Sequence, residues 1–460
     1  MQQQFTRAVL AAAVLAALAA CGGGGGGAAP ENPASAGAPT PSAASAGTLA
    51  TPPAAAQQPA AASAPAPAVA AAPAAAAPVA SAQPPAAPPD FVLHANSQGA
   101  QDSGSVVTLA GGGHVAVWAS GSGSADRHVR LQRFDAAGAR IGTEVVLATQ
   151  AFSPGVAALA DGSFVVTWTQ SPYQYEANGR AQRFDANGNA QGAPITLADA
   201  FFAYTARPAA LAAGGFVAAI DSTTGRYGTN YGALAFYRAD GTAAGAPVII
   251  NADLNDSATA VFETTASDLG HGRVAAAWVV VAGGTRGLAL RLFDAATGQP
   301  AAAAVTVASG AHVGAPALAT LPDGFALAWE ESAGSGRQVV LERFDREGRS
   351  LGRRVVATDA AAGAMQPELA ALPGGGFALG WRATRYGSTS LEREAFLQRF
   401  DAAGLATGAV QSLGSIQVDL ATTNVFNDTL ALTPFAGGRV LVLTGDWGAA
   451  SSWDVKAGVR

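Results

Sequence analysis

From Phe91 onward one residue pattern recurs about every fifty residues, and no other feature constrains the fold as strongly. Each copy begins with small residues and a Gly-rich turn, then has an apolar run ending in a large side chain, then two further runs separated by a turn. That large side chain recurs as Trp118, Trp168, Trp278, Trp329 and Trp381, with Ile220 and Leu443 in two divergent copies. The aromatic residue of the third run recurs as Phe134, Phe184, Tyr237, Phe293, Phe344 and Phe400.

Each copy is predicted to form four short strands joined by tight turns, which is the composition of a β-propeller blade. A segment of this length is too long to fold around a single hydrophobic core, whereas radial repetition gives each pair of blades a core of its own. We therefore predict an all-β fold for residues 90–460, a seven-bladed β-propeller of four-stranded blades. The recurring Trp and Phe residues are interpreted as packing between blades and not as platforms for sugars.

The two ends of the repeat region complement each other. The last copy has three strands, around 429–432, 439–443 and 454–460, and then the sequence ends without a fourth. Phe91 to Ala95 precedes the first copy and matches the fourth strands of later copies. We expect this N-terminal strand to complete the last blade, because that pairing closes the ring and removes its open edge.

The copies resemble the Gln-Arg-Phe-Asp-type repeats of large bacterial surface and secreted proteins, as in Gln182-Arg183-Phe184-Asp185. The resemblance covers 91–460, although the third and seventh copies depart from it. It implies a propeller fold and an extracellular setting, and the family carries no single known activity. The Arg before the Phe is expected to have a structural role, such as a bond to a neighbouring turn.

The first 21 residues have the organisation of an export signal. Arg7 supplies a positive charge, and Ala8 to Ala20 is an apolar run about 20 Å long as a helix, too short to span a bilayer. The end of the run, Leu18 to Cys21, resembles the lipobox of bacterial lipoproteins, which implies a signal peptide at 1–20 and a lipid on the thiol of Cys21. In the enterobacterial members of that family an acidic residue after the cysteine retains the lipoprotein in the inner membrane. Because Gly22 stands there, the resemblance implies the outer membrane, with its periplasmic or surface face left open. The alternative is an ordinary signal peptide with an incidental cysteine.

Residues 21–89 are predicted to be a disordered tether between the lipid and the propeller. The segment after Cys21 is almost entirely Gly, Ala, Pro and Ser, with Glu31 as its only charge and no aromatic residue. Such a composition buries too little apolar surface to offset the entropy of ordering. The localisation expected from these features is the bacterial cell envelope.

Composition excludes several classes of function. The net charge of −6 argues against nucleic acid as a partner, and a single cysteine excludes an intrachain disulfide and multi-cysteine metal sites. The segment Asp185-Ala-Asn-Gly-Asn189 begins like a calcium loop, but no acidic residue closes it. Asp and Gly at hairpin turns explain this recurring Asp-x-x-Gly pattern without metal. We therefore predict no metal and no cofactor.

The two loops that vary between copies, from second to third strand and from fourth to first, lie on one face of a propeller. Aromatic and arginine residues in these loops are candidate binding residues, since such side chains often anchor recognition surfaces. The set is Tyr173, Tyr175, Tyr204, Arg226, Tyr227, Tyr231, Arg385 and Tyr386, with Phe201 and Phe202 nearby. The alternative is that they pack long loops onto the ring.

Two functions from different classes remain open. The first is a lipid-anchored binding or scaffold module for an envelope protein or glycan, and on this reading the chain is not an enzyme. The second is an envelope carbohydrate-active enzyme, a hydrolase or lyase, with carboxylates at the central channel. Its best candidate is Glu368, with Asp253, Asp256 and Asp359 in neighbouring loops. No catalytic residue stands in a recognisable sequence context, so the binding module is preferred.

Overall fold

A computed structural model describes most of the repeat region. The residues it describes are 91–94, 101–121, 126–173, 176–197, 202–223, 230–250, 259–359, 366–387, 390–419, 429–447 and 453–460. The predicted signal peptide at 1–20, Cys21 and the tether at 21–89 therefore lie outside the described residues. Within the described part, no helix is long and apolar enough to cross a membrane.

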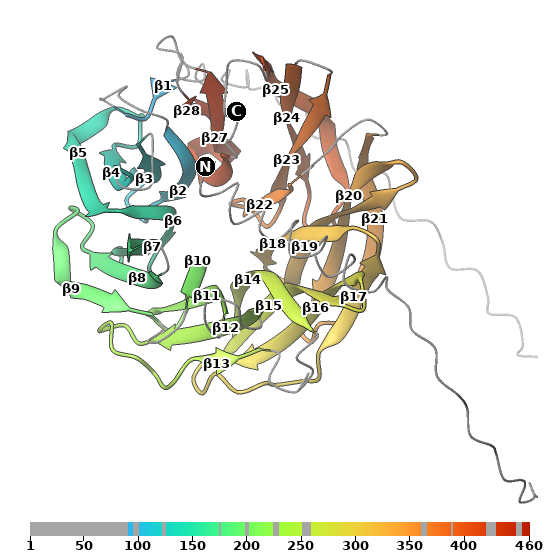
Figure 1. Ribbon diagram of the computed structural model, residues 1–460, viewed down its shortest axis with the longest axis horizontal. Helices are drawn as coiled ribbons and strands as arrows, with labels where there is room; N and C mark the ends of the chain where they lie inside the picture. The colour runs from blue at the N-terminus through green and yellow to red at the C-terminus, as the bar shows by residue number, and fades with distance from the viewer. Residues whose placement is uncertain are drawn as a thin grey trace, which may run out of the picture. The chain divides into compact units, whose positions relative to one another are not determined.

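The described residues form seven antiparallel sheets of four strands each, arranged as a ring (Figure 1). The first blade comprises β2 (Gln101–Thr108), β3 (His114–Ser120), β4 (His128–Phe134) and β5 (Arg140–Thr149). The second comprises β6 (Ala151–Ala158), β7 (Phe164–Tyr173), β8 (Glu176–Phe184) and β9 (Ala190–Thr196). The third comprises β10 (Phe202–Ala210), β11 (Phe216–Thr223), β12 (Asn230–Tyr237) and β13 (Val248–Ile249).

The fourth blade comprises β14 (Ala260–Gly270), β15 (Arg273–Ala282), β16 (Thr285–Asp294) and β17 (Val305–Gly310). The fifth comprises β18 (Val313–Leu321), β19 (Gly324–Ala333), β20 (Gly336–Asp345) and β21 (Ser350–Asp359). The sixth comprises β22 (Glu368–Ala371), β23 (Phe377–Tyr386), β24 (Ser390–Phe400) and β25 (Ala406–Asp419). The seventh comprises β26 (Leu430–Phe435), the 3₁₀ turn η1 (Ala436–Gly438), β27 (Arg439–Trp447), β28 (Trp453–Val459) and β1 (Phe91–Val92). The predicted seven-bladed propeller is confirmed.

The N-terminal strand closes the ring as predicted. β1 pairs antiparallel with β28, with Phe91 opposite Ala457 and Val92 opposite Lys456. The pairing continues one residue further, where the backbone N–H of Leu93 donates to the carbonyl of Val455 at 3.2 Å. The last blade is thus assembled from both ends of the propeller domain, which links its first strand to its last.

Apolar side chains fill the seams between blades. The recurring tryptophans lie within the second strands, which continue for two to five residues beyond them, and are buried, with exposed fractions of 0–3%. In several blades the aromatic residue of the third strand stacks on a Phe of the second, with ring centroids 4.6–5.1 Å apart: Phe164–Phe184, Phe216–Tyr237, Phe325–Phe344 and Phe377–Phe400. These rings are inter-blade packing, as the repeat pattern indicated.

The hairpin turns use their Asp and Gly residues as expected. The Asp185 carboxylate accepts the backbone N–H groups of Asn187 and Asn189 at 2.8 Å, and Gly188 has φ of 82°. A hydrogen bond from the Asn189 side chain, together with these two backbone hydrogen bonds, lowers the pKa of Asp185. The Arg before the third-strand Phe reaches the next blade in the case of Arg133, whose guanidinium donates to the carbonyl of Ala186 at 2.9 Å.

The seventh blade corrects one equivalence drawn from the sequence. Backbone pairing places Gly113 and Arg439 at the same position, just after the three-residue turns that follow Leu109 and Phe435. The fifth residue after this position is Trp118 in the first blade and Thr444 in the seventh. Leu443 therefore does not correspond to the recurring tryptophan. It faces the other way and packs against the first blade, because side chains alternate along a strand.

Candidate functional site

The first strand of each blade lies nearest the centre of the ring in Figure 1, and in most blades its pairing is irregular near its start. Register shifts mark a β-bulge there in the first five blades. A non-glycine residue adopts a left-handed backbone at this point in most blades: Ser103, Ser153, Glu263, Ala315 and Gln366, with φ between 31° and 57°. A bulge takes a backbone N–H out of the ladder, so these amides need other acceptors.

Side chains of the preceding blade supply those acceptors. A carboxylate does so at three successive seams: Asp221 accepts from the N–H of Thr264 at 2.8 Å, Glu263 from Ala315, and Glu330 from Gln366 at 3.1 Å. The hydroxyl of Thr429 accepts from Gly104 at 3.0 Å where the seventh blade meets the first. We call these contacts the bulge latches. They join the start of an inner strand to the first or second strand of the preceding blade, where the two variable loops of each blade meet the ring.

An arginine or histidine accompanies the latch carboxylates. Glu330 is 5% exposed, and its carboxylate contacts Arg337 at 2.7 Å and His312 at 2.6 Å. Arg207 lies 3.4 Å from Asp221, and Arg286 lies 3.5 Å from Glu263. Asp102 pairs with Arg127 in the first blade. These acidic and basic side chains are paired with one another, so their role in the described structure is to hold blades together.

Glu368 differs from the latch carboxylates. It begins β22, its side chain is exposed, and no hydrogen bond or ion pair to its carboxylate occurs among the described residues. Although solvent reaches the side chain, the surrounding blades displace much of the water around its carboxylate. This desolvation raises the pKa of Glu368 to about 7, and the positive charges of Arg207 and Arg382 oppose the rise. Arg207 belongs to the third blade, so this interaction spans the axis of the ring. A carboxyl group with such a pKa can exchange protons near neutral pH.

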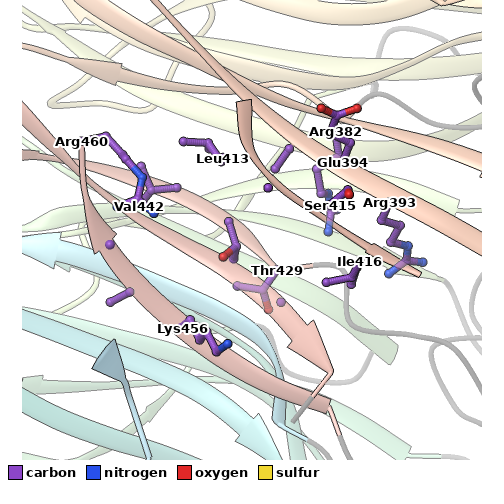
Figure 2. Close-up of a pocket in the computed structure, with 16 residues that line it drawn as sticks. Arg382, Arg393, Glu394, Leu413, Ser415, Ile416, Thr429, Val442, Lys456 and Arg460 are labelled. Carbon is purple, nitrogen blue, oxygen red and sulfur yellow. The ribbon is translucent and has the colours of Figure 1, made fainter. Parts of the chain in front are cut away.

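A groove lies in the seam between the sixth and seventh blades (Figure 2). At this seam Thr444 takes the place of the recurring tryptophan, and Arg460, bonded to Val440, takes the place of the third-strand aromatic. The buried apolar cluster is correspondingly small, with Ala378, Leu397, Leu430, Val440 and Val442 as its members among the described residues. The space left by the missing rings is a cavity of about 210 Å³.

Basic side chains dominate the charged lining of the groove. Lys456, the sole lysine of the chain, lies directly opposite Thr444 on β28. The groove also contains Arg382, Arg393 and Arg460, against one acidic side chain, Glu394. Figure 2 shows Arg393 and Glu394 on the sixth-blade wall and Lys456 and Arg460 on the wall from the seventh blade. No aromatic residue is among those that line it.

The predicted binding residues do not form one described cluster. Tyr175, Arg226 and Tyr227 lie outside the described residues, as do Phe201, Asp253 and Asp256. The backbones of Tyr173, Tyr204, Tyr386 and Asp359 lie in β7, β10, β23 and β21, each near a variable loop.

Two of the predicted binding residues have described side chains. Tyr231 is 8% exposed within the cluster between the second and third blades, and this burial raises its pKa, so it packs the ring and does not face solvent. Arg385 lies 3.4 Å from Glu394, a wall residue of the groove, and 3.7 Å from Glu392. Of the predicted set, Arg385 is thus the residue that the structure connects to the groove.

Sequence reasoning did not identify the groove. The signal was present, since Lys456 is the only lysine and the seventh copy lacks the recurring tryptophan. Aligning Leu443 with that tryptophan concealed the substitution by Thr444. Among the described residues no group of three His, Cys, Asp or Glu side chains is placed to hold a metal ion.

No family model and no curated protein sequence matches the chain. Solved structures with some similarity include a protein of unknown function from Dyadobacter fermentans, with 14% identity, a TM-score of 0.48, and coverage of 65% of this chain and 94% of that one. The polysaccharide lyase Uly1 has 10% identity, a TM-score of 0.45, and coverage of 76% and 88%. The NanB sialidase from Streptococcus pneumoniae has 9% identity, a TM-score of 0.42, and coverage of 82% and 70%. At these scores the similarity says nothing about what this chain binds.

Proposed function

We propose that this chain is a lipid-anchored binding module of the bacterial cell envelope, whose propeller holds a protein or glycan ligand in the groove between its sixth and seventh blades. One observation carries the proposal. At the seam where Thr444 and Arg460 replace two rings, the space is left open and lined by four cationic side chains and one acidic side chain. Ring closure does not require this, because the other seams are filled by apolar side chains. The ligand is accordingly expected to be anionic.

The lipid anchor and the outer-membrane location are part of the proposal. They are supported by the short apolar run before Cys21, the small residues at its end, and the uncharged segment that follows. Several acyl chains on one cysteine make attachment stable, where one chain binds only marginally. Mass spectrometry of the N-terminal peptide from membranes should find acylated Cys21, whereas an unmodified N-terminus would contradict the anchor.

Binding is tested with the full mature chain carrying Cys21→Ser, which removes the acylated thiol. The probes are polygalacturonate and poly-glutamate, with dextran as the uncharged counterpart. Thr444→Trp refills the groove with the residue that other blades place there, and Lys456→Glu reverses one charge. Both variants should weaken binding at least tenfold. Arg349→Glu is the control, because Arg349 is 75% exposed at a hairpin turn outside the groove.

Two results would count against the groove. In the first, neither polyanion binds more tightly than dextran. In the second, one of them binds, but Thr444→Trp binds it as tightly as the unsubstituted chain. Binding to the groove should also weaken as salt is raised, because the attraction between charged groups is screened.

A second candidate function, an envelope hydrolase or lyase acting on carbohydrate, is favoured by Glu368. Its pKa of about 7 allows it to serve as a general acid or base at neutral pH. Most glycoside hydrolysis needs a second carboxylate about 5–10 Å away, and Asp253 and Asp256, the nearest sequence candidates in the third-to-fourth blade loop, lie outside the described residues. Release of reducing ends or unsaturated products from a polysaccharide panel, abolished by Glu368→Gln, would support this function over simple binding.

A further inference from the structure

A second pocket lies between the first and second blades. Its volume is about 450 Å³, and it is bounded by the outer strand of the first blade and by three strands of the second. The lining residues are Val146, Leu147, Ala148, Thr149, Trp168, Gln170, Arg180 and Pro194. None of them lines the groove between the sixth and seventh blades, so the two sites are separate.

Two hydrogen-bond donors in this pocket have no acceptor. Trp168 is 3% exposed, and its indole Nε1–H is buried without a partner. The Nε–H of Arg180 is likewise buried without a partner. The two residues lie directly opposite each other on β7 and β8, so the donors belong to one cross-strand pair. Buried donors in folded proteins are nearly always satisfied, and an unsatisfied pair therefore calls for an explanation.

The first blade contains the same pair with the indole N–H and the arginine Nε–H both satisfied. Trp118 lies opposite Arg130 in the matching register of β3 and β4. The indole N–H of Trp118 donates to Gln101 Oε1 at 2.7 Å. Arg130 donates from Nε to Ser120 Oγ at 2.6 Å and from a terminal nitrogen to Glu144 Oε1 at 2.5 Å. The acceptors are thus an amide, a hydroxyl and a carboxylate.

The second blade has lost all three acceptors. Strand pairing places Ala151 at the position of Gln101, because each lies opposite the residue two after the tryptophan. By the same register Gln170 replaces Ser120, and Pro194 replaces Glu144. The amide nitrogen of Gln170 instead donates to the carbonyl of Thr149. A terminal nitrogen of Arg180 donates to the Thr196 hydroxyl, and Arg180 makes no ion pair in the described part of the chain. The substitutions remove internal acceptors and leave a pocket beside the donors.

We propose that this pocket binds a small carboxylate ligand, which the second blade takes from solution where the first blade uses its own Glu144. The carboxylate would accept from Arg180 and from the indole N–H of Trp168, and the ligand body would occupy the space beside Pro194. The volume of about 450 Å³ accommodates one sugar acid or a dicarboxylic acid of similar size. Arginine is suited to this role because its planar fork matches the geometry of a carboxylate.

The test follows the indole N–H resonance of Trp168 by ¹H–¹⁵N NMR in the full mature chain carrying Cys21→Ser. That resonance is assigned by its loss in Trp168→Phe. The probes are glucuronate and glutarate, with glucose as the neutral counterpart of glucuronate. A carboxylate should shift the Trp168 resonance saturably and leave that of Trp118 in place, while glucose should shift neither. Binding by both acids identifies the carboxylate alone as the recognised group, and binding by glucuronate alone identifies a sugar acid.

The decisive variant is Pro194→Glu, which restores the internal carboxylate of the first blade. It should abolish binding of the acid and raise the melting temperature, since the new side chain occupies the site. Ala186→Glu, at the exposed hairpin turn between β8 and β9 and outside the pocket, adds the same charge and should leave binding within about twofold of the unsubstituted chain. Absence of any shift of Trp168 with either acid overturns the proposal, and so does unchanged binding in Pro194→Glu. A chain that does not bind polyanions in the groove, but whose Trp168 resonance shifts on adding a small acid, would still support the second site.

Discussion

Ring closure by the N-terminal strand makes a quantitative prediction for Leu93→Ala. Leu93 is 1% exposed and belongs to the apolar cluster that joins the seventh blade to the first, with Trp118 and Val455 among its members. Removing three carbon atoms from a buried side chain costs about 2.4 kcal/mol at ~0.8 kcal/mol per group, and the cavity left behind raises the loss to about 3–4 kcal/mol. The free energy of unfolding should fall by that amount.

The assay is chemical denaturation of the full mature chain, followed by tryptophan fluorescence. Ile141→Ala serves as the matched control, because Ile141 is 39% exposed on an outer strand, and its truncation should cost less than about 1 kcal/mol. The reasoning is refuted if Leu93→Ala is no more destabilising than Ile141→Ala. That result would mean that the N-terminal strand does not hold the last blade in place.

Three further predictions concern single side chains. Glu330→Ala should lower the free energy of unfolding by about 3 kcal/mol, because it leaves Arg337 and the bulge amide of Gln366 without a buried carboxylate. Glu330→Gln keeps an acceptor and should lower the free energy of unfolding clearly less. Equal losses for the two variants in denaturation curves would argue against the latch. Glu368 holds its proton more tightly in the folded chain, with a pKa of about 7 against 4.5 unfolded, so stability should fall as pH rises from about 4.5 to 7. Because solvent screens the carboxylate, the fall in stability should amount to only about 1 kcal/mol. Glu368→Gln should remove it, and parallel curves of stability against pH for the two chains would contradict the raised pKa of Glu368. Cys21→Ser should move the protein from the membrane to the soluble fraction in immunoblots of fractionated cells, and retention in the membrane would show that another feature anchors it.

The architecture was predictable from the sequence because each blade is built from local signals. Fixed-position tryptophans and Asp-x-x-Gly turns define the strands, and their period defines the ring. Even the closure of the last blade follows from counting strands at the two ends. Such signals depend on residues within one hairpin, which a linear pattern reports directly.

Contacts between blades were much less predictable. The bulge latches join Glu263 to Ala315 and Glu330 to Gln366 across seams, and no spacing in the sequence indicates which carboxylate faces which amide. The groove depends on Thr444, whose equivalence to tryptophan becomes clear only from the register of β27. Tyr231 was interpreted as a loop residue because it follows a variable segment, but strand β12 begins one residue earlier and buries it.

The second blade shows how comparison between copies can reveal a site. Trp168 and Arg180 look like ordinary repeat residues until the first blade shows the acceptors that they lack. A repeat protein thus contains internal controls, because a blade with a satisfied pair shows what the unsatisfied pair requires. Strand register identifies the equivalent positions of the two blades without any alignment with other proteins.

The central claim, that the propeller is a binding module with its ligand in the groove between the sixth and seventh blades, is tested most directly by one titration. Polygalacturonate is added to the mature chain carrying Cys21→Ser, with and without Thr444→Trp, and the heat of binding is measured at low and at physiological salt. The account predicts saturable binding that weakens with salt and falls at least tenfold when the groove is filled. Equal binding by the two chains, with both folded to the same melting temperature, would contradict it.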